Sequence, residues 1–265
     1  MLSLIRMMES LRYEVVAASI LSILSVQLIL GRTRKTPLTS TVSMGRSLQV
    51  QRRLQHILSG LIVLYFQRYS RASEFILFLS ISTLAILFIH FSRLHSSFIQ
   101  KHFIHHFRYI LRDSEMRGMR VPGALYFLIG DIIAFFLYPK NFCSLVILSV
   151  TFGDPTAGIV GTLFESRKLI GNKSFAGTIG CAIVSGFVLT FASHIFGIIP
   201  SDFSSYYIAF GLLGSISAVS EMLAVLDDNL TMPILFGAIF RILIAFSDFI
   251  PKVIAELAIM LYYAL

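Results

Sequence analysis

Long apolar runs with almost no charged residues constrain this sequence more than any other feature. A bilayer core about 30 Å thick needs roughly 20 apolar residues to be crossed as a helix. The chain of 265 residues contains nine candidate runs, of which two are short. They cover approximately residues 15–30, 54–67, 75–91, 122–139, 142–164, 175–199, 205–226, 230–247 and 253–265. We therefore expect an all-α fold, a polytopic transmembrane helical bundle with eight or nine spans.

The composition supports this class of protein. Hydrophobic residues make up 56% of the chain, charged residues make up 14%, and the mean hydropathy is +0.80. Soluble domains have about 45–50% apolar and about 25% charged residues, so a water-soluble globule is excluded. The net charge of +8 does not indicate a nucleic-acid partner, because the basic residues fall between apolar runs and form no basic domain. The two cysteines lie within apolar runs and predict neither a disulfide framework nor a metal site.

The basic residues are distributed unevenly between the two membrane faces. If all nine runs cross, 15 of the 22 Lys and Arg residues fall on one face and six on the other. The positive-inside rule makes the richer face cytoplasmic. Its segments are residues 31–53, 92–121, 165–174 and 227–229. We expect an N-terminal anchor helix with a basic cytoplasmic segment over residues 1–50, and one membrane-embedded domain over residues 51–265.

The largest polar insertion, residues 92–121, predicts a helix on the membrane surface. Its apolar residues recur at three- and four-residue spacing from Phe98 to Leu111, as in an amphipathic helix that lies in the interface. Such a helix would help to capture a lipid. The histidines between His102 and His106 have no nearby acidic partner, which favours an interfacial helix over a zinc site.

The fifth run contains an acid among small residues. Asp154 follows Gly153 in an apolar stretch, where a carboxylate costs about 2.5–3.5 kcal/mol on insertion scales and needs a partner, a metal or a water-filled cavity. A short basic loop then leads to a turn whose backbone N–H groups could face phosphate, with Lys173 as the point charge. The residues of this turn are Gly171, Asn172, Lys173, Ser174 and Gly177. A glycine-rich packing interface between helices is the alternative.

Acidic residues also mark the end of the seventh run, where Glu221 is followed by Asp227, Asp228 and Asn229. Two adjacent acids at a membrane edge indicate a cation, because carboxylate oxygens suit Mg²⁺, which takes one or two of them together with substrate phosphates. The candidate metal ligands are Asp154, Asp227 and Asp228. In the alternative interpretation Asp228 or Asn229 caps the eighth helix, and both roles can coexist.

Other charged residues allow simpler interpretations. Arg52 and Arg53 lie four and three residues before His56, on neighbouring helical faces, and this cationic cluster could hold phosphate, although arginines that anchor a helix end would give the same pattern. Residues 112–118 could be a solvated helix end. Asp131 and Arg241 lie mid-span, both about 13–17 Å from the cytoplasmic edge, and we expect them to form a structural ion pair.

Together these blocks resemble the CTP-dependent lipid kinases, the family of dolichol kinase, phytol kinase and CTP-dependent diacylglycerol kinase. The resemblance extends over about residues 50–247, and the order of the blocks is more specific than any single block. The residues that carry it are Arg53, His56, Glu115, Gly118, Gly153, Asp154, Ala157, Gly161, Gly171, Lys173, Ser174, Gly177, Glu221, Asp227, Asp228, Asn229, Leu230, Thr231 and Pro233. The chain departs from the family at Thr162, where an arginine is common, and at Ala176, where a glutamate is common. A phosphate contact must then come from elsewhere, such as Arg167 or Lys168.

The resemblance implies transfer of the γ-phosphate of CTP to a lipid hydroxyl at the cytoplasmic face, with a divalent metal such as Mg²⁺. It implies a membrane-embedded lipid kinase domain in which Asp154 and either Asp227 or Asp228 hold the metal on the nucleotide phosphates, and Lys173 contacts these phosphates. The other of these two aspartates would orient the lipid hydroxyl, so Asp154, Lys173, Asp227 and Asp228 are the expected catalytic residues. The expected nucleotide- or phosphate-binding residues are Arg53, His56, Gly153, Gly171, Asn172, Ser174, Gly177 and Asn229, and the expected supporting residues near the substrate are Glu115, Arg117 and Glu221.

The acceptor expected from this resemblance is diacylglycerol, which would give phosphatidate. A chain of this length with a short basic N-terminal segment resembles the diacylglycerol kinase branch more than the longer dolichol kinases. Dolichol, phytol or another polyprenol is the alternative acceptor, and a phosphatidate cytidylyltransferase or a membrane transporter is the alternative function. The endoplasmic reticulum membrane is the expected location if the source is eukaryotic. The sequence makes no prediction about the oligomeric state.

Overall fold

The computed structural model describes residues 49–108, 110–118, 120–198, 203–224 and 226–243. The apolar runs at residues 15–30 and 253–265 lie outside these residues, as does nearly all of the expected N-terminal anchor and basic segment.

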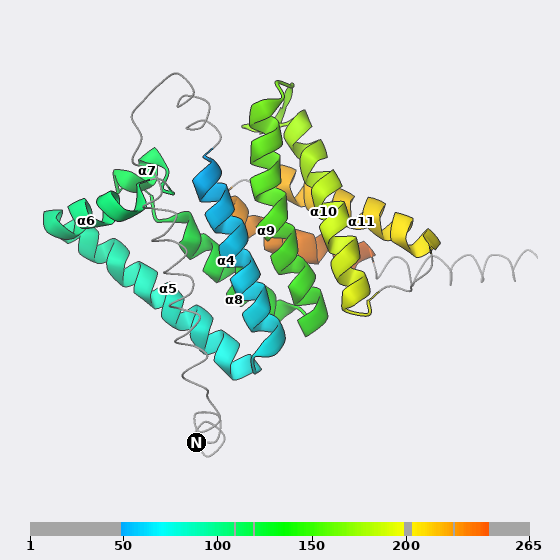
Figure 1. Cartoon of the computed structure of the whole chain (residues 1–265), viewed down its shortest axis with the longest axis horizontal. Helices are drawn as coiled ribbons and strands as arrows, with labels where there is room; N and C mark the ends of the chain where they lie inside the picture. The colour runs from blue at the N-terminus through cyan, green and yellow to red at the C-terminus, as the bar shows by residue number, and fades with distance from the viewer. Residues whose placement is uncertain (1–48, 109, 119, 199–202, 225, 244–265) are drawn as a thin grey trace, which may run out of the picture.

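Helices dominate the described residues (Figure 1). A short hairpin of two antiparallel strands connects α9 to α10. The elements are α4 (Val50–Tyr69), α5 (Ala72–His95), α6 (Ser97–Phe107), α7 (Asp113–Met116), α8 (Gly123–Leu137), α9 (Lys140–Leu163), β1 (Lys168–Ile170), β2 (Lys173–Ser174), α10 (Phe175–Ile195) and α11 (Phe203–Leu223), followed by a helix over residues 228–243.

Four of these helices are long and apolar enough to cross a bilayer, namely α5, α9, α10 and residues Tyr206–Leu223 of α11. The helix α8 is also apolar but has only 15 residues, and α4 carries two arginines and a histidine in its first two turns. The helical, multispan character expected from the apolar runs therefore fits the structure. The count of eight or nine spans is not confirmed.

The helix α9 lies at the centre of the bundle, between α4 and α10 (Figure 1). Small residues let these helices approach closely. A Cβ atom at Gly161 would lie 2.5 Å from Ser174 Oγ, and one at Gly177 would lie 2.6 Å from the carbonyl oxygen of Ala157. The glycines around Asp154 therefore do form the helix-packing interface that was the alternative interpretation, and this role coexists with a polar site beside them.

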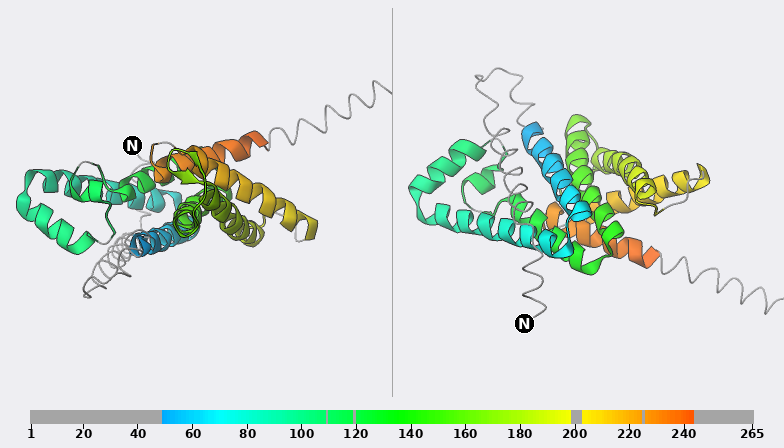
Figure 2. Two further views of the ribbon diagram at one scale, coloured as in Figure 1. Left: turned by 90° about the horizontal axis from the view of Figure 1, so that it is seen from above. Right: turned by 60° about the horizontal axis from the view of Figure 1, so that its bottom comes forward.

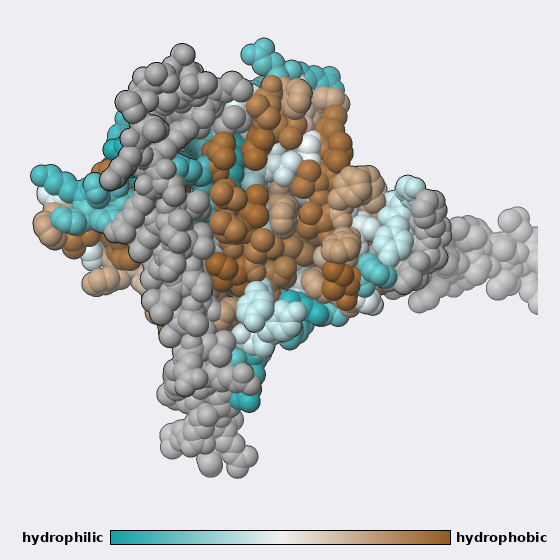
Figure 3. Space-filling model, in the orientation of Figure 1, coloured by the Kyte–Doolittle hydropathy of each residue, from teal (hydrophilic) through white to brown (hydrophobic). Residues whose placement is uncertain are grey.

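The segments with polar motifs meet at one end of the bundle. The N-terminal end of α4, the C-terminal end of α9 and the β1–β2 hairpin all lie at the upper end in Figure 1. Seen from above, α5 and α6 extend to one side of this bundle, and α10 and α11 to the other (Figure 2). The face in Figure 3 is apolar across its middle and hydrophilic mainly toward its ends, as expected for helices surrounded by lipid.

The expected ion pair between Asp131 and Arg241 is wrong. Asp131 is 0% exposed, and neither of its carboxylate oxygens has a hydrogen-bond partner among the described residues. Arg241 is exposed, and its guanidinium donates to the carbonyl oxygen of Leu137 at 3.4 Å. A similar depth along two helix axes does not bring two side chains together. Rotation about the axis directs Asp131 inward and Arg241 outward.

Candidate active site

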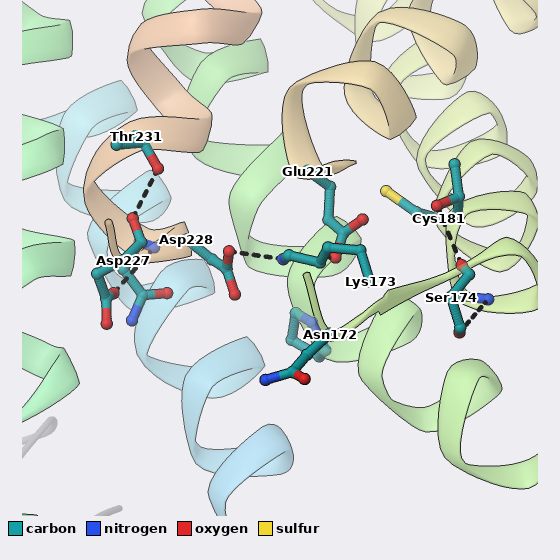
Figure 4. Close-up of polar contacts among 12 residues, drawn as sticks. Asn172, Lys173, Ser174, Cys181, Glu221, Asp227, Asp228 and Thr231 are labelled. Atoms are coloured by element: carbon teal, nitrogen blue, oxygen red, sulfur yellow. Dashed lines mark hydrogen bonds and ion pairs between the residues drawn. The ribbon is translucent and has the colours of Figure 1, made fainter. Parts of the chain in front are cut away.

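Lys173 is held between two acids from other parts of the chain. Its Nζ lies 2.6 Å from Asp228 Oδ1 and 2.7 Å from Glu221 Oε1, and Figure 4 shows the lysine side chain between them. The hairpin explains this position, because Gly171 adopts φ +53 at the turn and directs strand β2 back toward the end of α11. The expected site residues Lys173, Asp228 and Glu221 are thus brought together.

The electrostatics of this cluster follow from its burial and its charges. Burial opposes the charged form of Lys173, but the carboxylates of Asp228 and Glu221 outweigh burial and raise the Lys173 pKa. Burial raises the pKa of Asp228 to about 7, and the nearby Asp154 carboxylate adds to this effect. Asp228 and Asp154 therefore repel each other, which is a condition that a divalent cation relieves.

The two neighbouring aspartates have different roles in the structure. Asp227 caps the helix over residues 228–243, since its Oδ1 accepts from the Asn229 N–H at 3.2 Å. Its Oδ2 lies 3.3 Å from Arg112 Nη1. The cap is thus Asp227 and not Asp228 or Asn229, and Asp228 is directed toward Lys173 instead (Figure 4). The Asn229 side chain donates to the carbonyl oxygen of Gly123 at 3.1 Å.

The turn that was expected to bind phosphate also caps a helix. Ser174 Oγ accepts from the Gly177 N–H at 3.2 Å at the start of α10, and the Ala176 N–H donates to Ser166 Oγ at 2.9 Å. These N–H groups are engaged within the protein. The phosphate-binding roles of Gly171, Asn172, Ser174 and Gly177 stay predictions.

Asp154 lies on α9 among cations from separate segments. The cationic side chains that act on its carboxylate are Arg52, Lys173 and Arg112, and the His56 ring lines the same cavity. Within the described part of the chain its carboxylate forms no hydrogen bond or ion pair. Asp154 lines a cavity, so it is an acid in a cationic setting that remains available to a ligand. Gly153 beside it packs against Cys181, where a Cβ atom would lie 3.1 Å from the sulfur.

Arg53 and His56 attach α4 to α9. Arg53 Nη1 donates to the carbonyl oxygen of Pro155 at 2.9 Å, and its guanidinium covers Gly158 so closely that a Cβ atom there would overlap it. His56 Nε2 lies 3.2 Å from the carbonyl oxygen of Val150. These two residues are thus bound to α9, and they are not simply arginine and histidine anchors of a helix end.

The cavity beside Asp154 has a volume of about 280 Å³. Charged and polar side chains gather at one part of its lining, which includes Arg52, Arg53, His56, Arg112, Glu115, Asp154 and Asn229. Arg52 belongs to the cationic cluster that the sequence indicates at the start of this helix, whereas Arg112 was not expected to be a site residue. Arg112 has a local signal of mixed charge that fits a solvated helix end equally well, and only the folded chain shows its contact with Asp227.

Glu115 and Arg117 have different positions. Glu115 is buried, and its carboxylate accepts from the N–H groups of Arg112 at 2.7 Å and Gly123 at 2.9 Å. It thereby joins α7 to the start of α8 and fixes the backbone of Arg112. Arg117 is exposed, and none of its side-chain contacts with the described residues is a hydrogen bond or an ion pair.

The described residues contain no group of three or more His, Cys, Asp and Glu side chains arranged to hold a metal. Mg²⁺ nevertheless binds through one or two carboxylates together with substrate phosphates. Asp154 fits this requirement because its carboxylate lines the cavity and is engaged by no hydrogen bond or ion pair with the described residues, and Asp228, bound by Lys173 through Oδ1, is the second candidate carboxylate. Asp227 fits it less well, because its oxygens are used by a backbone N–H and by Arg112.

The chain is similar to two proteins named CTP-dependent diacylglycerol kinase 1. It is 28% identical to the protein of Eremothecium gossypii over 157 residues, which cover 52% of this chain and 49% of the relative. It is 28% identical to the protein of Schizosaccharomyces pombe over 134 residues, which cover 47% of this chain and 61% of the relative. These matches confirm the resemblance to this branch, and the chain spans about half the length of the first relative. No family model and no solved structure matches the chain.

Proposed function

We propose that this protein is a CTP-dependent lipid kinase that transfers the γ-phosphate of CTP to the hydroxyl of diacylglycerol, which yields phosphatidate and CDP. The observation that carries the proposal is that the ion pair of Lys173 with Asp228, at 2.6 Å, acts electrostatically on Asp154, which lines a cavity with a charged end. The names of the two relatives support the choice of nucleotide and acceptor.

Phosphoryl transfer depends mainly on positioning the phosphates and on neutralising their charge. The cations of the site meet this requirement. Glu221 and Asp228 keep Lys173 protonated and oriented. Arg52 and Arg112 face Asp154 from α4 and from the start of α7. We assign these three cations to the phosphates of the nucleotide, and this assignment replaces the arginine that is missing at Thr162.

The second requirement is a bound divalent cation, and the acids of the site are its candidate ligands. A divalent cation such as Mg²⁺ would be held by Asp154 and Asp228 and would neutralise the nucleotide phosphates. Asp227 has a structural role in this account, because it caps a helix and holds Arg112.

His56 is suited to orient the lipid hydroxyl. Since the carbonyl oxygen of Val150 can only accept, the proton of a neutral imidazole lies on Nε2, and Nδ1 is left as an acceptor. His56 also lines the cavity. A hydroxyl near Asp154 could therefore donate to the ring as the oxygen attacks the γ-phosphate.

The expected membrane topology agrees with this chemistry. The site residues lie in or beside the segments that the positive-inside rule places in the cytoplasm, where CTP is available. We propose a cytoplasmic active site, one membrane-embedded kinase domain over residues 51–265, and an endoplasmic reticulum location if the source is eukaryotic.

An assay with purified protein in detergent tests the function. Labelled CTP or ATP is supplied with Mg²⁺ and with diacylglycerol, dolichol or phytol in turn. We expect phosphatidate and CDP in equal amounts, with CTP as the better donor and diacylglycerol as the better acceptor. Release of pyrophosphate would indicate a cytidylyltransferase instead, and turnover of dolichol or phytol alone would change the acceptor. Lipid flux across sealed vesicles without consumption of CTP would indicate a transporter.

A further inference from the structure

The cavity beside Asp154 changes from polar to apolar along α4. The helix contributes Arg52 and His56 near Asp154, then Ser59, and finally Val63. The spacing of three or four residues between the last three places them on one face of the helix. At 1.5 Å per residue, Arg52 and Val63 are about 16 Å apart along the axis. The lining is therefore charged at one end and apolar about two to three turns further into the bundle.

The same gradient follows two other helices. On α5, His90 lies near the charged end, where Arg93 donates to its ring and to the carbonyl oxygen of Glu115. Ile86 and Ala85 continue the lining away from that end. On α8 the lining runs from Gly123, whose N–H is bound by Glu115, to Phe127 and Leu128. The lining is thus polar near Asp154 and mainly apolar further along the three helices, with Ser82 of α5 as a polar residue in the apolar part.

We propose, on the basis of the proposed function, that this cavity is the acceptor site of the kinase. The hydroxyl and glycerol of diacylglycerol occupy the charged end beside Asp154 and His56, and one acyl chain enters the apolar part between α4, α5 and α8. The lipid hydroxyl must reach the residues that face the nucleotide, whereas the acyl chain must lie in an apolar environment away from water. The gradient satisfies both conditions within one continuous space.

The size of the cavity limits what it can hold. A volume of about 280 Å³ is near the lower end of small-molecule sites, which range over about 300–1,000 Å³. A complete lipid with two long chains does not fit. The site therefore holds the head and the first part of one chain, and the remainder of the lipid stays in the bilayer.

The helices α5 and α6 both line this space. Phe103 and Phe107 of α6 line the cavity, so the helix that was expected to capture a lipid contributes two aromatic rings to the site. On α5, Leu84 is 65% exposed and Phe88 is 74% exposed, and neither lines the cavity. A lipid in the cavity would therefore contact the lining residues of α5, whereas a lipid in the bilayer would contact Leu84 and Phe88.

Photolabelling without CTP tests the site directly. The probe is a diacylglycerol with a diazirine in the glycerol-proximal half of one acyl chain, added to the full-length protein in detergent–lipid micelles. Labelled positions are assigned by mass spectrometry, with and without excess unlabelled diacylglycerol. We expect competed labelling at Val63, Ile86 or Leu128. Labelling confined to Leu84 and Phe88, without competition, would overturn the proposal.

Variants that fill the cavity provide a second measurement. Ala85→Phe should reduce competed labelling and raise the KM for diacylglycerol about tenfold or more, with the KM for CTP unchanged. Leu84→Phe is the matched control on the outer face of α5 and should change neither value. Ala124→Leu on α8 repeats the test if Ala85→Phe does not elute as a monodisperse protein. Unchanged labelling and KM in both filling variants would contradict the acceptor site.

The two proposals fail in different ways. Competed labelling of the cavity without any formation of phosphatidate would refute the kinase and retain a lipid site. If the cavity-filling variants form phosphatidate as the wild type does, the kinase proposal would stand and this acceptor site would be refuted.

Discussion

Lys173 and Asp228 are 55 residues apart in the sequence, yet Lys173 Nζ lies 2.6 Å from Asp228 Oδ1. Lys173→Met removes the cation and leaves Glu221 and Asp228 facing each other. Removal of one partner from a buried ion pair costs about 3–5 kcal/mol. We expect a smaller loss here, because the Lys173 and Asp228 side chains are 18% and 21% exposed. Thermal unfolding in detergent should show a lower midpoint, and phosphate transfer should be lost.

A double variant separates the two roles of Lys173. In Lys173→Met/Glu221→Gln the buried negative charge is removed together with the cation, so the unfolding midpoint should recover in part. Phosphate transfer should not recover, because the cation for the nucleotide is still absent. Transfer at the wild-type rate in this double variant would show that Lys173 has only a structural role.

The adjacent residues Asp227 and Asp228 should respond oppositely to substitution. Asp227→Ala removes a helix cap, which costs about 0.5–2 kcal/mol of stability, whereas Asp227→Asn keeps a capping side chain and should remain closer to the wild type. Asp228→Asn can still accept from Lys173, so folding should be preserved while transfer decreases by about 100-fold or more. Midpoints and transfer rates measured on the same preparations test this contrast. Equal losses of transfer in Asp227→Asn and Asp228→Asn would contradict it.

Much of the candidate site could be predicted from the sequence, because the relevant residues interrupt apolar runs. An acid such as Asp154 in an apolar helix indicates a partner, a metal or a water-filled cavity, and Lys173 in a glycine-rich turn indicates a site for phosphate. The pattern could not distinguish Asp227 from Asp228. Their different roles depend on the direction in which the chain enters the helix over residues 228–243.

Substitution of a glycine in α9, compared with one in α11, tests the packing of the bundle. A methyl group at Gly161 would lie 2.5 Å from Ser174 Oγ, whereas a methyl group at Gly211 on α11 would meet nothing within 4 Å. Gly161→Ala should therefore lower the unfolding midpoint, by an amount equivalent to about 1–3 kcal/mol of overpacking. Gly211→Ala is the matched control and should be neutral or slightly stabilising, because alanine favours the helix. The opposite order of midpoints would contradict the packing.

Asp131 should oppose stability rather than support it. Its carboxyl group is buried and has no hydrogen-bond partner in the part of the chain that the structure describes, and burial of a polar group without hydrogen bonds is costly. Asp131→Leu should thus leave the unfolding midpoint unchanged or raise it, with transfer retained. A clear decrease of the midpoint would indicate a partner for Asp131 and would restore the ion-pair interpretation.

Rotation about helix axes explains most of what the sequence could not predict. Apolar runs locate α5, α9, α10 and α11 well, since hydropathy depends on composition along the chain. Which side of each helix faces which neighbour depends on packing. For this reason Asp131 and Arg241 were wrongly paired, and Arg112 was not assigned to the site.

Asp154 provides the most direct test of the account as a whole. Its carboxylate lies among four positive or titratable groups but is tied to none by a hydrogen bond within the described residues, so Asp154→Asn should fold like the wild type. The measurement is transfer of labelled γ-phosphate from CTP to diacylglycerol by wild type and Asp154→Asn, at matched unfolding midpoints. We predict a loss of about 100-fold or more. Wild-type transfer by a normally folded Asp154→Asn would contradict the proposal that the nucleotide and the lipid hydroxyl meet at this carboxylate.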